Sequence, residues 1–253
     1  MILTFNEEEN IGRTLAKLTW AEQIVVIDSG STDRTLEIVR RFPQAEIIRR
    51  EFDSAAAQCN FGLSQIKSEW VLSLDADYVL SDALVAEIAS LEPEANVRGY
   101  WAKFVYQIFG RSLRASLYPP RAVLYRKSAA VYVDEGHTQR VRIAGALLTL
   151  TNPIYHDDRK SIARWFNSQV RYVSLEADRL SMGDRESFRP IDHVRLLMVP
   201  APLLIVFYTL LVKRCVLDGW PGWYYAAQRL CAELMLCIEL LDRRLRSSNR
   251  VSK

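Results

Sequence analysis

Short apolar runs alternate with helix-like segments along the first half of the chain. The clearest run is Ile24–Ile27, four aliphatic residues that end at Asp28. Aliphatic runs of this length, bounded by turn residues, predict buried strands. We expect four such strands, at Met1–Phe5, Ile24–Ile27, Glu46–Arg49 and Trp70–Asp75.

Helical segments separate these strands. Asn6 belongs to a residue type that caps helices, and Glu7–Glu9 would follow it in a first turn, where the helix dipole favours anions. Further helices are expected after the turn at residues 29–33 and over Ala55–Ile66. This order predicts an α/β fold with a Rossmann-related, mostly parallel central sheet and helices on both faces.

Three carboxylates follow two of the predicted strands. Asp28 ends the second strand, and Asp75 and Asp77 end the fourth. Parallel sheets bind ligands beyond the carboxyl ends of their strands, so we expect these side chains to meet in one crevice. A nucleotide would fit there, since carboxylates accept hydrogen bonds from ribose and base and, with substrate phosphates, hold Mg²⁺ or Mn²⁺. The alternative is helix capping, which we favour for Asp33.

A strip rich in aromatic and basic residues runs from Tyr100 to Lys127. Its loop residues Arg111, Arg114 and Arg121 are candidates to bind a phosphate or an anionic sugar of an acceptor. The aromatic residues are expected mainly to form one face of an ordinary strand. His156 is a candidate metal ligand, because imidazole binds Mn²⁺, although a single histidine is more often structural.

Composition narrows the class of protein. A chain of 253 residues, 49% of them hydrophobic, is long enough for one full α/β domain and an appendage. The net charge of +3 is too small to predict a nucleic-acid partner. The four cysteines show no CxxC spacing and the N-terminus resembles no secretory leader, which favours a reduced, cytosolic chain.

The last quarter of the chain has a different character. An uncharged, mostly apolar run extends from Leu196 to Val212, close to the lower limit of about 17 to 25 residues for a spanning helix. Tryptophans, tyrosines and a basic pair follow it, as is typical of a bilayer interface. We therefore predict a first domain over residues 1–189 and a membrane-associating helical tail over residues 190–253.

Three arrangements of this tail are considered. The preferred one is a monotopic or re-entrant helix pair, because Pro200 and Pro202 disfavour one continuous helix at the start of the apolar run. The second is a helical hairpin packed on the sheet or on another subunit of a homo-oligomer. A single membrane span is the third.

Five segments in this order resemble a known enzyme family. They are TFNEEENI, VVIDSGSTDRT, AAAQCNFGL, WVLSLDAD and the later LDGWPG. Together they are similar to the family 2 glycosyltransferases of the GT-A fold, particularly the bacterial enzymes that extend lipopolysaccharide core or related cell-envelope glycans. The resemblance implies a nucleotide-sugar donor, a divalent metal and a sugar or lipid-linked acceptor.

The resemblance also implies roles for individual residues. Asp28 would contact the base, Asp75 the ribose and Asp77 the metal on the diphosphate. The remaining nucleotide-site candidates lie on the first strand, on the segment directly after it and on the helix that follows the third strand: Thr4, Asn6, Glu7, Gln58 and Asn60.

The catalytic base is expected in DEGHTQRV, residues 134–141. Related enzymes tend to carry His-Glu here, whereas His137 of this chain is followed by Thr138. An inverting transfer needs one carboxylate to deprotonate the acceptor hydroxyl. Glu135 is the preferred candidate and Asp134 the substitute.

The sequence therefore predicts a metal-dependent inverting glycosyltransferase at the cytoplasmic face of the cytoplasmic membrane. One alternative is a degenerate transferase that acts as a membrane scaffold. A nucleotidyltransferase is less favoured, because its first strand would usually lead into a glycine-rich, basic phosphate loop, and NEEEN at residues 6–10 is the opposite.

Overall fold

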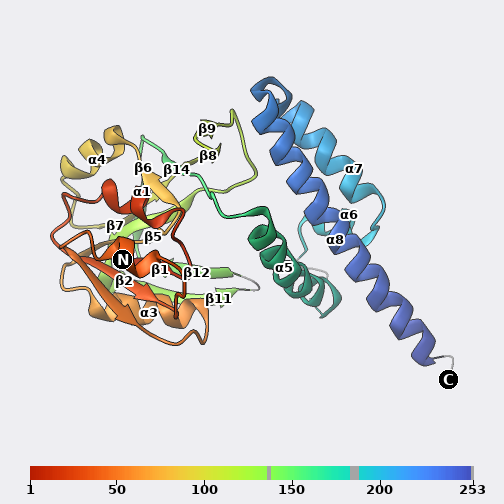
Figure 1. Ribbon diagram of the computed structural model, residues 1–253, viewed down its shortest axis with the longest axis horizontal. Coiled ribbons are helices and arrows are strands. Elements are labelled where there is room, and N and C mark those ends of the chain that lie inside the picture. Colours follow the sequence, from red (N-terminus) through yellow and green to blue (C-terminus); the bar gives the residue numbers. More distant parts are fainter. Residues whose placement is uncertain (136–137, 183–187, 252–253) are drawn as a thin grey trace. The chain divides into compact units, whose positions relative to one another are not determined.

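The computed structural model describes residues 1–135, 138–182 and 188–251 (Figure 1). The chain forms two compact units. Unit 1 consists of Met1–Ser112 and Leu117–Lys160, and unit 2 of Leu113–Ser116 and Ser161–Lys253. From the sequence we predicted a domain boundary near residue 190, whereas the division falls after Lys160. The reason is that helix α5 (Ile162–Met182) packs against α8 (Trp220–Val251).

A four-stranded parallel sheet forms the centre of unit 1. Its strands, in spatial order, are β3 (Ala45–Arg49), β2 (Ile24–Asp28), β1 (Ile2–Thr4) and β5 (Leu74–Asp75). In the register of this sheet Thr4 lies beside Asp28, and Leu3 lies beside Asp75. The carboxyl ends of three strands therefore meet at one edge, as the sequence predicted.

Helices cover both faces of this sheet (Figure 1). Ile24 and Val26 of β2 point into a core shared with α1 (Ile11–Ala16), α2 (Thr35–Val39) and α4 (Asp82–Ala89). Val25 and Ile27 point the other way, toward α3 (Ala55–Gln65). A strand that is buried on both faces reads as an unbroken aliphatic run, which is the pattern seen here.

The predicted fourth strand is two strands. β4 (Trp70–Leu72) pairs antiparallel with β10 (Arg121–Arg126), and β5 pairs parallel with β1, so the chain changes sheets at Ser73. β10 continues to β7 (Val97–Ala102) and β13 (Ala146–Thr149). The remaining strands are β6 (Tyr78–Leu80), β14 (Ile154–His156), β8 (Phe104–Ile108) and β9 (Arg111–Ser112) in a third sheet, and the hairpin of β11 (Ala130–Glu135) and β12 (Thr138–Ile143).

Asn6 does not cap the next helix, so that prediction is wrong. Helix α1 begins only at Ile11, after Asn10. Asn6 instead adopts a left-handed backbone conformation, with φ of 55°, and its side-chain oxygen accepts a hydrogen bond from the Thr32 N–H at 2.7 Å. Asn6 thus joins the loop after β1 to the loop after β2.

Unit 2 is helical. Its elements are α5, α6 (Pro190–Leu196), α7 (Pro200–Phe207), the π-helical turn η3 (Tyr208–Val212), the 3₁₀ turn η4 (Cys215–Asp218) and α8. Helix α7 lies alongside α8 (Figure 1). Within the described residues, we find no helix with the length and apolar character needed to cross a bilayer. Association of this tail with a membrane stays a prediction.

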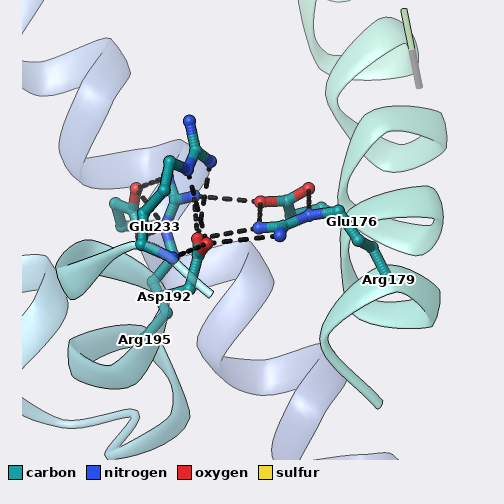
Figure 2. Close-up of polar contacts among 6 residues, drawn as sticks. Glu176, Arg179, Asp192, Arg195 and Glu233 are labelled. Carbon is teal, nitrogen blue, oxygen red and sulfur yellow. Dashed lines mark hydrogen bonds and ion pairs between the residues drawn. The ribbon is translucent and has the colours of Figure 1, made fainter. Parts of the chain in front are cut away.

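A network of charged side chains ties three helices of unit 2 together (Figure 2). Arg179 of α5 binds Asp192 of α6 with 2.7 Å between Nη2 and Oδ1. Arg195 of α6 reaches Glu176 of α5 at 3.0 Å and also pairs with Glu233 of α8. Asp192 is fully buried, and its partners satisfy the charge that would otherwise make burial unfavourable.

The LDGWPG segment is a tight turn into α8. Gly219 has a φ of +66°, and a Cβ atom on Gly222 would lie 1.7 Å from the carbonyl oxygen of Cys215. Asp218 accepts hydrogen bonds from the backbone N–H and Nε of Arg114, each at 3.1 Å. Both glycines and the acid of this motif thus have structural roles within unit 2.

Candidate active site

The carboxyl edge of the parallel sheet carries three of the predicted nucleotide-site residues. Asp28 is fully buried, and its carboxylate accepts hydrogen bonds from the N–H groups of Gly30 and Ser31 at 3.1 Å. Asp75 is more open, with 42% of its side chain exposed. The Thr4 hydroxyl oxygen is buried without a hydrogen-bond partner among the described residues. Asp28 therefore orders the loop after β2, while Asp75 faces solvent.

Asp77 and His156 form a pair beyond this edge. His156 Nε2 lies 3.2 Å from Asp77 Oδ2, because β14 pairs with β6 directly after Asp77. Burial works against the charged forms of both groups. The charge and hydrogen bond of His156 nevertheless hold the pKa of Asp77 below its usual range, and Asp77 in turn raises the pKa of His156.

The two predicted metal ligands are thus adjacent. No cluster of three or more His, Cys, Asp or Glu side chains suited to a metal is found among the described residues. The Nδ1 atom of His156 is buried without a partner in that same part of the chain. One carboxylate together with substrate phosphates is a common arrangement for Mg²⁺ and Mn²⁺, and the imidazole of His156 would be an additional ligand there.

The three candidate arginines belong to different elements. Arg121 begins β10, lies 3.8 Å from the Asp75 carboxylate and stacks its guanidinium over the Tyr118 ring at 5.0 Å. Arg111 is exposed on β9. Arg114 belongs to unit 2, where it pairs with Asp218. Arg121 therefore lies beside a predicted donor-site acid.

Lys160 is a site residue that the sequence analysis missed. Its ammonium lies 2.7 Å from a carboxylate oxygen of Glu7, and Asn10 donates hydrogen bonds to both Glu7 and Asp158, at 2.9 and 3.0 Å. Burial raises the pKa of Glu7 to about 7, partly opposed by the charge of Lys160. The nearby carboxylates, Asp77 first among them, outweigh burial and raise the pKa of Lys160. Lys160 therefore stays positively charged within the electrostatic reach of Asp77.

Asp157, next to His156 in the chain, holds two arginines by ion pairs. It is buried, and its Oδ2 atom pairs with Arg13 at 3.0 Å and Arg159 at 2.8 Å. The available sequence signal was the run of polar and charged residues HDDRK at 156–160. Only His156 of this run was selected from the sequence. Asp157 and Lys160 were not, because their partners Arg13 and Glu7 lie more than a hundred residues away along the chain.

The amides of α3 already have protein partners. Gln58 is buried, accepts from Arg50 Nη1 at 2.7 Å and donates to Ser29 Oγ at 3.1 Å. Asn60 donates to the carbonyl oxygen of Tyr132 and accepts from its N–H, both at 2.9 Å. These contacts fix α3 against the loop after β2 and against β11.

The candidate bases lie at the end of β11. Asp134 accepts hydrogen bonds from Ser54 Oγ at 2.7 Å and from the Ala56 N–H at 3.1 Å, so both its oxygens serve the N-terminus of α3. Glu135 is the last residue of β11. Its side chain, and the whole of His137, lie outside the described residues.

Comparisons with known proteins bear on the family and the fold. Residues 1–122 match the model of glycosyl transferase family 2. An uncharacterised glycosyltransferase of Rickettsia felis is 24% identical over 100% of this chain and 92% of its own length. The lipopolysaccharide core biosynthesis glycosyltransferase LpsC of Rhizobium meliloti is 33% identical over 87 residues, which cover 33% of this chain and 32% of LpsC.

One solved structure is similar over nearly the whole chain. The mannosyltransferase PcManGT from Pyrobaculum calidifontis, solved with GDP-Man and Mn²⁺, superimposes with a TM-score of 0.53 at 14% identity and covers 95% of this chain and 85% of its own. The fold is therefore that of the α/β GT-A-like glycosyltransferases. The match to glycosyl transferase family 2 covers residues 1–122, a little under half of the chain.

Proposed function

We propose that the protein transfers a sugar from a nucleotide-diphosphate sugar, with a UDP-sugar as the first candidate, to a hydroxyl of a cell-envelope glycan or lipid-linked acceptor. The observation that carries this proposal is the meeting of Thr4, Asp28 and Asp75 at one sheet edge, next to the Asp77–His156 pair. A donor consists of a nucleoside, a diphosphate and the sugar attached to that diphosphate. This edge offers hydrogen-bond acceptors for the nucleoside, and the charged Asp77–His156 pair lies where the diphosphate would follow.

On this proposal the donor nucleoside lies along the sheet edge. Asp75, the more open acid, accepts hydrogen bonds from ribose hydroxyls. Asp28 acts on the base through the loop that it orders, and Thr4 presents its unpaired hydroxyl to the same space. Asn6, Glu7, Gln58 and Asn60 shape the pocket through the contacts they make with neighbouring loops and strands.

The diphosphate would face the Asp77–His156 corner. Asp77 and His156 are the residues that would hold Mg²⁺ or Mn²⁺, and a bound metal would neutralise charge on the leaving diphosphate. Support comes from the adjacency of the two side chains and from the Mn²⁺ named with PcManGT. Arg121 and Lys160 add fixed positive charge near the same acids.

Glu135 is the proposed base on the acceptor side. Its carboxylate takes the proton of the acceptor hydroxyl, whose oxygen then bonds to the anomeric carbon of the donor sugar. The bond from that carbon to the diphosphate breaks on the opposite face, which inverts the anomeric centre. Asp134 is less suitable, since its oxygens are already hydrogen-bonded to the start of α3. Arg111 and Arg114 stay predictions as acceptor contacts.

A panel of UDP- and GDP-sugars, each with and without Mn²⁺, tests the proposal by thermal shift and by hydrolysis of the donor. We expect one donor to stabilise the protein in the presence of Mn²⁺ and to be turned over slowly in water. Stabilisation by nucleoside triphosphates alone would favour a nucleotidyltransferase. Donor binding without any hydrolysis or transfer would favour a degenerate scaffold.

A further inference from the structure

Unit 2 carries a large surface of exposed apolar side chains, which we call the apolar face. On α7 and η3, Leu203, Phe207 and Leu211 follow one another at four-residue intervals and are 70%, 56% and 55% exposed. Residues four apart lie on one side of a helix, so these three form a stripe. Across the turn the face continues with Leu217, Trp220 and Trp223.

The parts of the apolar face belong to adjacent elements. Helix α7 lies alongside α8 (Figure 1), and the turns η3 and η4 also pack against α8. Trp220 and Trp223 are three residues apart in the first turn of α8 and therefore share a side of that helix. Single exposed apolar residues need no explanation, but six of them on elements that pack against one another indicate an interaction surface.

The exposed charges of the segment that carries this face are of one sign. Between Leu197 and Ala232 the sequence contains a single acid, Asp218, and only 6% of its side chain is exposed because Arg114 holds it. Lys213 and Arg214 follow the stripe directly. Lys213 lies 5.5 Å from the centre of the Tyr208 ring, so its charge is kept at the edge of the apolar residues.

We propose that the apolar face binds an anionic lipid surface. Aliphatic side chains would enter the boundary between headgroups and acyl chains, the two tryptophans would lie at headgroup level, and Lys213 and Arg214 would contact lipid phosphates. A protein partner would be expected to meet the cations with acids, and the segment 197–232 that carries this face holds no exposed acid for a second copy to use. The inference places unit 2 on a membrane surface and does not depend on sugar transfer. If the proposed function holds, a lipid-linked acceptor would lie in the same membrane.

Co-sedimentation of the full chain with vesicles tests the proposal without any activity measurement. We expect the protein to pellet with phosphatidylcholine vesicles that contain phosphatidylglycerol, and much less with phosphatidylcholine alone. Phe207→Ser combined with Trp223→Ser should leave the protein in the supernatant. Leu148→Ser is the matched control, because it removes a side chain of similar exposure, 50%, from unit 1 and should change nothing.

A second pair of variants tests the charge. Replacing Lys213 and Arg214 with Gln should weaken binding to the anionic vesicles about fivefold for each charge removed, and added salt should have the same effect. Circular dichroism confirms that each variant keeps its helices. Failure of the full chain to bind anionic vesicles overturns the proposal. A second outcome would also overturn the proposal: the protein associates with itself as its concentration rises, Phe207→Ser abolishes this association, and no vesicle binding is found. The apolar face would then be a protein interface.

Discussion

At the scale of single residues, the closest approach between predicted ligands joins parts of the chain that are far apart. Asp77 and His156 are 79 positions apart and lie 3.2 Å from each other. Each was chosen for its own chemistry, and the pairing of β14 with β6 brings them together. Lys160, four residues beyond His156, was missed because its partner Glu7 lies on the first loop.

Asp77→Ala should remove the effect of Mn²⁺ on donor binding. The change leaves His156 as the single candidate ligand, so the metal and the donor diphosphate lose a shared anchor. We expect the Mn²⁺-dependent gain in donor affinity, measured by calorimetry, to fall more than about tenfold. Asp82→Ala is a suitable control, because that carboxylate is 87% exposed and pairs with Lys17. Unchanged Mn²⁺ dependence in Asp77→Ala would remove Asp77 from the metal site.

Glu135→Gln should lower turnover and leave donor affinity intact, because a base acts on the acceptor hydroxyl. The expected loss is about 10²- to 10⁴-fold in rate. Asp134→Ala should act differently: it removes the acceptor for Ser54 Oγ and the Ala56 N–H, which costs about 1 kcal/mol of stability, as loss of a helix cap does. Steady-state kinetics and thermal melts of both variants separate the roles. A fully active Glu135→Gln would place the base elsewhere.

Not every residue chosen from the sequence has chemistry left for a ligand. Asn60 uses its side-chain amide on the backbone of Tyr132, and Asn6 uses its oxygen on the loop at Thr32. A sequence shows that an amide is present but not which distant backbone it binds. The acids at strand ends were easier to place, because strand direction alone determines the edge to which they belong.

At the scale of elements, strand existence could be predicted but strand membership could not. The run WVLSLD was expected to be one strand, and it divides at Ser73 between two sheets. The apolar pattern is continuous because both halves are buried, so nothing local marks the change of partner. The pairing of β4 with β10 determines the change of sheet. Strand β10 begins at Arg121, 46 residues after the end of β5.

Gly222→Ala should destabilise unit 2, although Ala usually stabilises a helix relative to Gly. The usual gain is about 1 kcal/mol, but here the new Cβ would lie 1.7 Å from the Cys215 carbonyl and would force α8 away from η4. We expect a net loss of about 1 to 3 kcal/mol in chemical denaturation followed by helix circular dichroism. Gly30→Ala provides the comparison: it has no neighbour within 4 Å, so its cost comes from the φ of +95° alone. A more stable Gly222→Ala would contradict the tight-turn explanation.

The charged network of unit 2 predicts how its helices respond to acid. Burial opposes the charged form of Asp192, yet hydrogen bonds from Arg179 and Arg189 lower its pKa from 3.8 to about 2. The folded pKa lies below the unfolded one, so this group stabilises the fold fully above about pH 4 and progressively less as the pH falls toward 2. Asp192→Asn should therefore be less stable at neutral pH and lose less stability in this window. Acid titrations of the wild-type protein and of Asp192→Asn, followed by circular dichroism, measure this difference. Equal loss of stability in both proteins would disprove the contribution of Asp192.

At the scale of the whole molecule, the chain combines a unit with a recognisable enzyme fold and a helical unit of a different kind. Four of the five motifs that carried the family resemblance lie in unit 1, where residues 1–122 also match the family model. The fifth, LDGWPG, lies in unit 2 and is explained by its turn geometry. A helical tail over residues 190–253 was predicted from the sequence, whereas helix α5 and its place in unit 2 were not. Helix α5 joins the other helices through tertiary packing of Ala177 and Leu180 against Leu236 and Leu240, which no local pattern shows.

Donor binding should protect one unit more than the other. All the proposed nucleotide and metal residues belong to unit 1, and each unit has its own buried core. A ligand that binds only the folded state stabilises it by about 2.7 kcal/mol at a hundredfold excess over its dissociation constant. We expect hydrogen exchange with donor and Mn²⁺ to slow in the loops after β1, β2 and β5 and around β14, while α7 and α8 exchange as before. Equal protection of α7 and α8 would contradict a donor site confined to unit 1, because the stabilisation would then be shared by helices that carry none of its proposed ligands.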